Sequence, residues 1–190
     1  MAEAARYTEE IVDDGASWYA VRLFTLRLED VRTFFREQGL ECFIPEKYID
    51  IEGHNGRPRQ VLRPVVRNLI FVKQLADEKL FRKIIQTANY KISVLRKSKD
   101  SQEYALIPHG QMYEFRLMCN PEITMRKFLS SEEARMKAGD EVYVQFGPLK
   151  GLSGRLVRSS KKYYLLKEVP GLSVMLKVSR WCCVPVEKKR

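Results

Sequence analysis

The glycine-rich segment at residues 139–157 constrains the fold more than any other part of the chain. Its first half alternates apolar and polar residues, which predicts a strand with one apolar face. That predicted face is formed by Val142, Val144 and Phe146. Gly147 then precedes a proline, and Gly151 and Gly154 can adopt the positive φ values that tight turns require. The segment therefore predicts a β-hairpin suited to a small, strongly curved barrel.

The same segment resembles the KOW motif, in which Gly-Asp precedes a strand and Gly-Pro-Leu-Lys-Gly forms the turn. The matching positions are Gly139, Asp140, Val142, Val144, Gly147, Pro148, Leu149, Gly151 and Gly154. KOW domains occur in transcription factors of the NusG family and in some ribosomal proteins. The resemblance alone therefore implies RNA polymerase or the ribosome as a partner.

Composition favours a soluble globular protein with an acidic or nucleic-acid partner. The 190 residues carry a net charge of +10, and residues 138–190 hold 11 basic against four acidic side chains. Such a balance attracts polyanions, although a solubilising surface explains it equally well. No apolar run approaches the roughly 20 residues of a membrane span, and residues 1–14 lack the basic and apolar pattern of a secretory signal, so we expect none. We expect a cytoplasmic protein without a membrane partner.

The cysteines and histidines do not form a recognisable metal or disulfide pattern. The residues concerned are Cys42, Cys119, Cys182, Cys183, His54 and His109. Their spacing matches no zinc motif, so we expect free thiols, no metal and no cofactor. A nucleophilic pair made by His109 with Cys42 or Cys119 stays open as an enzymatic alternative, but no activating third group accompanies it.

The N-terminal part reads as alternating strands and helices. Strands are expected near residues 18–23, 42–51, 60–73 and 92–95, and helices near residues 28–38, 76–87 and 108–118. A glycine-containing loop at residues 52–59 predicts a hairpin. This order predicts an α+β fold, a ferredoxin-like sandwich with a four-stranded antiparallel sheet covered by helices.

Composition divides the chain into four predicted regions. They are a flexible lead-in at residues 1–16, a first domain at residues 17–119, a linker at residues 120–137 and a second domain at residues 138–190. The linker mixes proline, serine pairs and charges, which predicts two domains that move independently.

The ordered combination of these pieces resembles the NusG family over residues 17–190. The resemblance rests on the strand Trp18-Tyr19, on Ile44-Pro45-Glu46-Lys47, on Phe71-Val72 and on the KOW segment. It implies an NGN domain followed by an SH3-like KOW barrel. Where members usually show Pro-Gly-Tyr-Val-Phe-Val, residues 67–72 read Arg-Asn-Leu-Ile-Phe-Val. This departure resembles specialised, operon-associated paralogues such as the UpxY-type antiterminators.

The resemblance implies a monomeric transcription elongation and antitermination factor without catalytic activity. In the family, the first domain docks on RNA polymerase, and the KOW domain recruits Rho, a ribosomal protein or the ribosome. Nascent RNA and non-template DNA are further expected partners. The alternative is a ribosome-associated or general RNA-binding KOW protein.

Candidate site residues follow from the resemblance and from the residue pattern itself. The residues expected to bind RNA polymerase are Tyr19, Arg22, Val66, Leu69 and Phe71. Weaker nucleic-acid contacts are expected from Arg57, Arg59, Arg63, Lys161 and Lys162. The KOW partner is expected at Phe146, Leu149 and Lys150. For the apolar members, ordinary core packing is the competing interpretation.

Overall fold

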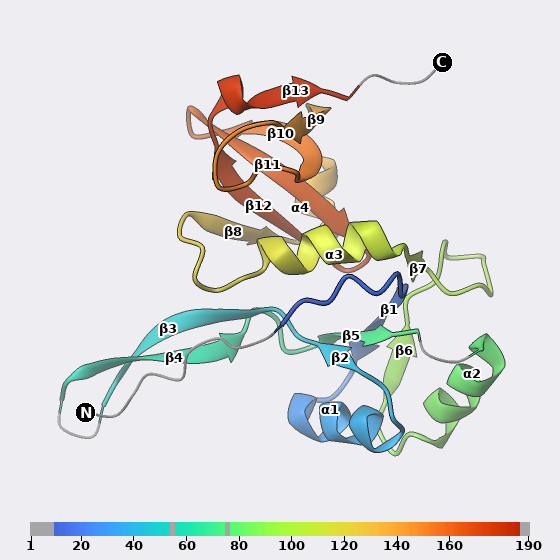
Figure 1. Cartoon of the computed structure of the whole chain (residues 1–190). Coiled ribbons are helices and arrows are strands. Elements are labelled where there is room, and N and C mark those ends of the chain that lie inside the picture. The colour runs from blue at the N-terminus through green and yellow to red at the C-terminus, as the bar shows by residue number, and fades with distance from the viewer. Residues whose placement is uncertain (1–9, 54–55, 75–76, 187–190) are drawn as a thin grey trace.

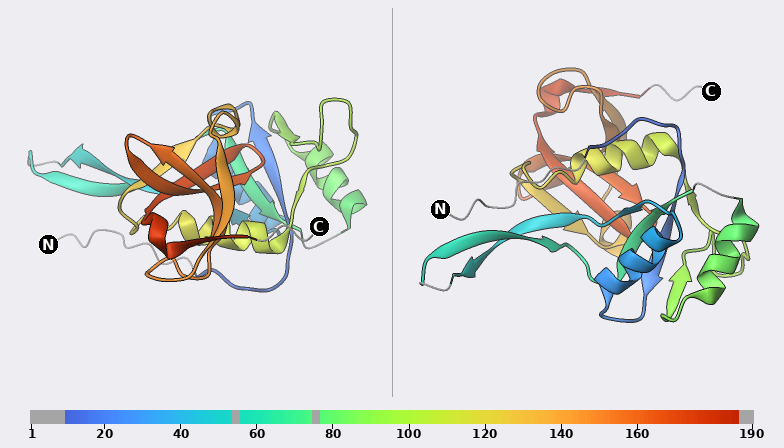
Figure 2. Two further views of the ribbon diagram at one scale, coloured as in Figure 1. Left: turned by 90° about the horizontal axis from the view of Figure 1, so that it is seen from above. Right: turned by 60° about the horizontal axis from the view of Figure 1, so that its bottom comes forward.

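The computed structural model describes residues 10–53, 56–74 and 77–186. Two sheet-based units pack against each other, and a long hairpin projects from the first unit (Figures 1 and 2). The helices are α1 (Leu28–Glu37), α2 (Glu78–Thr87), α3 (His109–Met118) and α4 (Ser131–Arg135). The three longer helices lie where the sequence predicts them, and α4 falls in the predicted linker.

The N-terminal unit is built on an antiparallel sheet. Its strands are β1 (Trp18–Leu23), β2 (Cys42–Phe43), β5 (Leu69–Lys73), β6 (Ile92–Val94) and β7 (Leu106–Ile107). They follow the order β2-β5-β1-β6, and β7 pairs with the end of β1. The predicted four-stranded antiparallel core is therefore confirmed, with one short strand added.

Alternation along β5 sends its side chains to the two faces of this sheet. Ile70 and Val72 belong to a buried cluster that also contains residues of α1 and α2. Leu69 and Phe71 belong to another cluster, which contains residues of α3. Two helices thus cover one face of the sheet, and α3 lies on the other (Figure 1).

The hairpin consists of β3 (Glu46–Glu52) and β4 (Pro58–Pro64), paired in register over their whole length. The sequence predicted one interrupted strand at residues 60–73, but β4 ends at Pro64 and β5 begins at Leu69. A proline removes one donor from the strand ladder, and here it marks the end of the strand. Residues 60–64 therefore belong to the hairpin and not to the central sheet.

The C-terminal unit is a six-stranded antiparallel sheet that curves strongly (Figure 2). Its strands are β8 (Arg126–Leu129), β9 (Gly139–Val144), β10 (Ser153–Ser159), β11 (Lys162–Val169), β12 (Leu172–Val178) and β13 (Cys183–Pro185). The order is β13-β9-β10-β11-β12-β8, and within the described residues no ladder joins β8 to β13. The expected closed, SH3-like barrel is therefore not confirmed.

Details of the predicted KOW hairpin differ from the expectation. Val142 and Val144 are buried, but β9 ends before Phe146, whose side chain is 56% exposed. Gly151 has the predicted positive φ of 95°, whereas Gly154 does not. Gly154 is needed for close approach, because an added Cβ would lie 2.6 Å from the carbonyl oxygen of Leu166.

The segment 120–137, predicted to be a linker, contains regular structure. Strand β8 pairs with β12, and α4 follows it directly. Ser130 caps α4 by accepting from the backbone N–H of Glu133, while the Glu133 carboxylate accepts from the backbone N–H of Ser130. This capping box fixes the start of the short helix. The segment is thus part of the C-terminal sheet unit.

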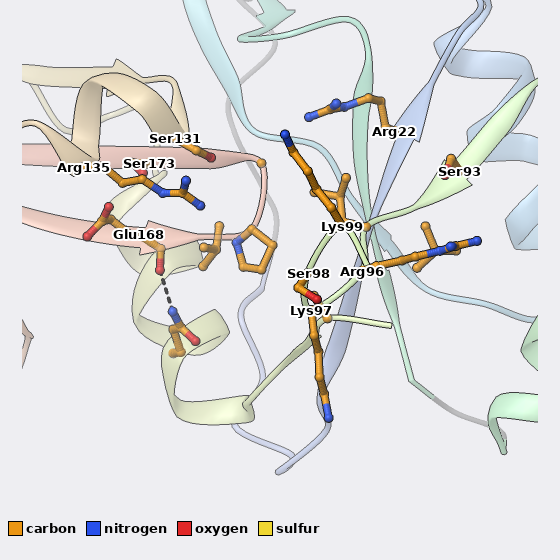
Figure 3. A pocket seen from close by; sticks show the side chains of 17 residues that line it. Arg22, Ser93, Arg96, Lys97, Ser98, Lys99, Ser131, Arg135, Glu168 and Ser173 are labelled. Carbon is orange, nitrogen blue, oxygen red and sulfur yellow. Dashed lines mark hydrogen bonds between the residues drawn. The ribbon is translucent and has the colours of Figure 1, made fainter. Parts of the chain in front are cut away.

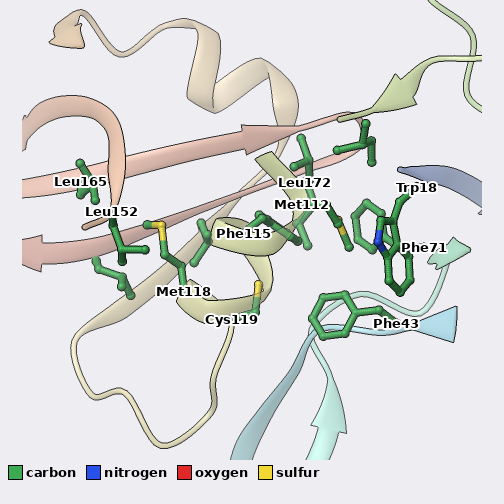
Figure 4. Close-up of a cluster of buried hydrophobic side chains, with 14 of the residues drawn as sticks. Trp18, Phe43, Phe71, Met112, Phe115, Met118, Cys119, Leu152, Leu165 and Leu172 are labelled. Atoms are coloured by element: carbon green, nitrogen blue, oxygen red, sulfur yellow. The ribbon is translucent and has the colours of Figure 1, made fainter. Parts of the chain in front are cut away.

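One buried cluster runs through both units, with α3 at its centre. Phe115 is fully buried between Phe71 of the first sheet and residues such as Leu165 and Leu172 of the second (Figure 4). The two units are therefore packed together in this structure, and their independent movement stays a prediction. The units pack together because α3 is covered from both sides: Phe115 packs against Phe71 of the first sheet, and Glu114 is hydrogen-bonded to Ser153 of the second.

The described part of the lead-in, residues 10–16, is held against the first unit. Asp14 forms an ion pair with Lys73, which also donates to Glu41 over 2.7 Å. The hydrogen bond from Lys73, joined by one from the backbone of Ala16, lowers the pKa of Asp14 below its ordinary value of 3.8. The four region boundaries themselves remain a prediction.

Candidate functional site: the seam between the two units

Except for Tyr19, the residues predicted to bind RNA polymerase lie on or near the face of the first sheet that the C-terminal unit covers. Leu69 is 3% exposed, and Phe71 is fully buried against Phe43 and Phe115 at ring distances of 6.2 and 5.5 Å. These two side chains are closed to any partner in this arrangement. Their predicted role in binding is not tested by burial alone.

The turn between β11 and β12 forms the closest contact across this seam. Gly171 has φ +92°, and a Cβ added there would lie 3.0 Å from Cδ1 of Leu69 and 3.1 Å from Cδ1 of Leu95. A residue with a side chain would meet both strain in the turn and a crowded neighbour. The turn therefore approaches the first sheet as closely as a glycine allows.

Polar contacts from α3 support the same seam. Glu114 accepts a hydrogen bond from Oγ of Ser153 over 3.0 Å and forms an ion pair with Lys167. Gln111 donates from Nε2 to the backbone oxygen of Glu168 over 2.6 Å. Because these groups are half-buried, the contacts are less screened than surface pairs and help to fix the orientation of the second unit.

A pocket of about 430 Å³ opens at the edge of this seam. Three of the five predicted polymerase-binding residues line it, namely Arg22, Val66 and Leu69. From the C-terminal side it is lined by Phe128 and Leu129 of β8 and by Gly171 and Leu172. The structure thus brings together a cation, a half-buried valine and the edge of a covered apolar surface.

Tyr19 and Phe71 do not line this pocket. The Tyr19 ring is stacked on Phe81 at 4.5 Å, on the face of the sheet that α1 and α2 cover. Its hydroxyl accepts from Nε2 of Gln74 over 3.0 Å, and burial raises its pKa. Alternation along β1 explains why Tyr19 and the residues on either side of it face opposite ways.

A second apolar surface lies at the far end of the C-terminal unit, where the KOW partner is expected. Phe146 stacks against Trp181 with ring centroids 6.4 Å apart, and Trp181 is 77% exposed. Beside them, Leu149 lines a pocket of about 270 Å³, and Lys150 is exposed. The sequence analysis did not include Trp181 among the candidate residues, although a tryptophan that follows Arg180 could have been considered for a partner contact.

The predicted nucleic-acid contacts fall on two separate elements. Arg57, Arg59 and Arg63 are exposed on or beside the hairpin strand β4. Lys161 and Lys162 are exposed at the turn between β10 and β11. The two sets do not share one element, and their contact with nucleic acid stays a prediction.

The structure gives no support to a Cys-His nucleophile. His109 begins α3 and Cys119 follows its end, so they are separated by about 15 Å along the helix axis. Burial raises the pKa of Cys42 to about 12, which keeps its thiol protonated at neutral pH. No group of three or more potential metal ligands occurs in the part of the chain that the structure describes.

The described helices contain none that is long and apolar enough to cross a lipid bilayer.

Comparison with known proteins identifies the N-terminal unit. No curated protein matches the chain. The family model described as "Transcription termination factor nusG" matches residues 16–116, more than half of the chain. The match covers every strand of the first sheet, the projecting hairpin and most of α3. The chain therefore belongs to the NusG family of transcription factors.

Proposed function

We propose that this protein is a transcription elongation and antitermination factor that binds RNA polymerase with its N-terminal unit and recruits a second partner with its C-terminal unit. The observation that carries the proposal is the NusG match over residues 16–116. Members of that family are non-enzymatic transcription factors that typically bind RNA polymerase. We further propose that the protein is cytoplasmic, monomeric and specific to a particular operon, like the UpxY-type paralogues it resembles.

The seam pocket is the proposed polymerase contact. Arg22 is exposed there and Val66 is half-buried, so both can meet a partner without rearrangement. Leu69 lies deeper and would meet the same partner only after the turn at Gly171 moves away. The proposal therefore includes a step in which polymerase displaces part of the C-terminal unit.

Such displacement sets a simple energetic condition. A partner shifts the equilibrium between covered and uncovered forms only by its differential affinity for the two. Each tenfold shift requires about 1.4 kcal/mol of that difference. Polymerase binding and exposure of the covered face would then be coupled, and bridging of two parts of the polymerase would oppose pausing without any chemical step.

The surface around Phe146 and Trp181 is the proposed site for the second partner. Aromatic side chains that stay exposed beside an apolar pocket commonly mark protein interaction sites. Neither ring is needed to fill the core, because both are more than half exposed. A ribosomal protein, the ribosome and Rho are the candidate partners.

Affinity for purified core RNA polymerase tests the main proposal. We expect the full-length chain to bind, and Val66→Asp to weaken binding by about tenfold, because it places a charge in the contact. Val186→Asp is the matched control, since Val186 is 48% exposed on the C-terminal unit. Equal losses in the two variants would remove the seam pocket from the contact, and failure of the wild type to bind would refute the proposal.

A further inference from the structure

A second, larger cleft lies between the two units, of about 840 Å³ (Figure 3). The N-terminal unit contributes Arg22 of β1 and the segment from β6 to Lys99. The C-terminal unit contributes α4 and the turn between β11 and β12. None of these residues is among the nucleic-acid contacts predicted from the sequence.

The cleft has a large excess of positive charge. Arg22, Arg96, Lys99 and Arg135 line it and are exposed, and none forms an ion pair with a described residue. A further lining cation, Lys97, is paired with Glu103 over 2.5 Å, which leaves four charges without an ion-pair partner in the part of the chain that the structure describes. Unpaired cations from both units in one concave surface attract anions strongly.

Among the described lining residues, the one carboxylate does not neutralise this excess. Glu168 forms an ion pair with Arg155, which lies outside the lining. Its backbone oxygen is also occupied, because it accepts from Gln111. The electrostatic character of the cleft is therefore set by the four unpaired cations.

A buried hydroxyl supplies an independent indication of a ligand. Ser173 lines the cleft and is 1% exposed, and its Oγ has no hydrogen-bond partner among the described residues. An unsatisfied buried polar group costs about 1–3 kcal/mol, which an acceptor atom from a bound molecule would offset. Further hydroxyls line the same cleft, from Ser93, Ser98 and Ser131.

The lining residues indicate which anion fits. Hydroxyls and guanidinium groups are donors that suit phosphate oxygens. None of the described residues that line the cleft is aromatic, so these residues offer no surface on which bases could stack. Recognition would therefore involve phosphates and not bases, which makes it independent of sequence.

The cations are also spread out. In Figure 3, Arg22 and Lys99 point into one part of the cleft, Arg135 points in from α4, and Arg96 extends away from them. A compact phosphate group needs donors that converge on one point. A row of separated cations instead suits a chain of phosphates.

From these observations we propose that the cleft between the units binds the sugar–phosphate backbone of a single nucleic-acid strand, held by Arg22, Lys99 and Arg135 and by the serine hydroxyls. This binding needs both units in their packed arrangement, because Arg135 comes from one and Lys99 from the other. The proposal does not rest on polymerase binding, and it is tested without polymerase.

Fluorescence anisotropy with a labelled oligonucleotide of about 12 nucleotides measures the binding directly. The full-length protein is titrated at salt concentrations from about 50 to 200 mM. The test variant combines Arg22→Ala, Lys99→Ala and Arg135→Ala. The matched control combines Lys79→Ala, Lys83→Ala and Arg158→Ala, which removes the same charge from exposed positions outside the cleft and outside the predicted nucleic-acid contacts.

We expect the test variant to lose at least about tenfold in affinity at low salt. The slope of log affinity against log salt should fall by about 2, since each phosphate contact on a single strand contributes about 0.7. The control should keep most of the affinity and slope. Equal losses in the two variants would show a diffuse charge effect and overturn the proposal.

Two more variants and one more ligand make the outcome unambiguous. Ser173→Ala should weaken oligonucleotide binding without lowering the melting temperature, because its hydroxyl makes no bond to a described residue. Arg135→Glu, on the exposed side of a short helix, replaces the triple variant if that variant fails to fold. Tripolyphosphate is titrated in parallel, and saturable binding of tripolyphosphate without binding of the oligonucleotide would refute the strand as the ligand.

Discussion

Replacement of Gly171 by alanine tests the closeness of the seam. An alanine at this turn position meets two penalties that can be separated. The first is backbone strain at φ +92°, which costs an L-residue about 1–2 kcal/mol. The second is crowding against Leu69 and Leu95 at 3.0–3.1 Å. Because leucine methyl groups can shift, the crowding costs about 1 kcal/mol, the low end for overpacking.

Gly151→Ala is the matched control. Its φ of +95° is nearly the same, and no atom lies within 4 Å of the position of an added Cβ. It should therefore cost about 1–2 kcal/mol of folding stability, against about 2–3 kcal/mol for Gly171→Ala. Urea unfolding monitored by circular dichroism measures the difference, which is the crowding at the seam.

The same pair of variants tests whether the seam must open for polymerase to bind. Turn strain is present in both covered and uncovered forms, so it cancels, whereas crowding at Leu69 exists only in the covered form. Gly171→Ala should then raise the affinity for core RNA polymerase by about fivefold, the equivalent of 1 kcal/mol. Gly151→Ala should leave it unchanged. Equal affinities for both variants and the wild type would refute this reasoning.

Three further predictions concern other parts of the molecule. The pKa of Asp14 is lowered in the folded state, so its contribution to stability is present above about pH 4 and is lost as the pH falls through the lowered value. Urea unfolding at a series of pH values should therefore show that Asp14→Asn loses less folding free energy on acidification than the wild type does. Burial raises the pKa of Cys42 to about 12, so its thiol should resist iodoacetamide at pH 8 until the protein unfolds. Mass spectrometry of the labelled peptide measures the reaction, and rapid labelling of the folded protein would contradict the burial of Cys42. Trp181→Ala should change the free energy of unfolding by less than about 0.5 kcal/mol, as for an exposed position, while it weakens capture of the second partner; a large loss of stability would show that the ring packs in the core.

The sequence predicted the first unit well because its elements are long and strongly patterned. The apolar periodicity of α1 and α2 and the aromatic strand at Trp18 needed no tertiary information. At residues 120–137 the sequence predicted a linker, whereas the structure has a four-residue strand and a five-residue helix there. Both elements are too short to be recognised from apolar periodicity. The capping box formed by Ser130 and Glu133 was the one local signal there.

The candidate site could be predicted only in part. Alternation correctly placed Leu69 and Phe71 on one face, but it could not show that a second sheet covers that face. The second sheet reaches this face through α3, which has neighbours on both sides. The helix therefore lacks the one-sided apolar pattern of a surface helix. The basic cleft was missed for a related reason, because Lys99 and Arg135 are far apart in sequence and meet only through that packing.

The affinity of the full-length protein for core RNA polymerase, with wild type and Gly171→Ala compared side by side, tests the central claim most directly. The account predicts saturable binding by both proteins, tighter for Gly171→Ala. Absence of binding by either protein, measured on samples shown to be folded, would contradict it.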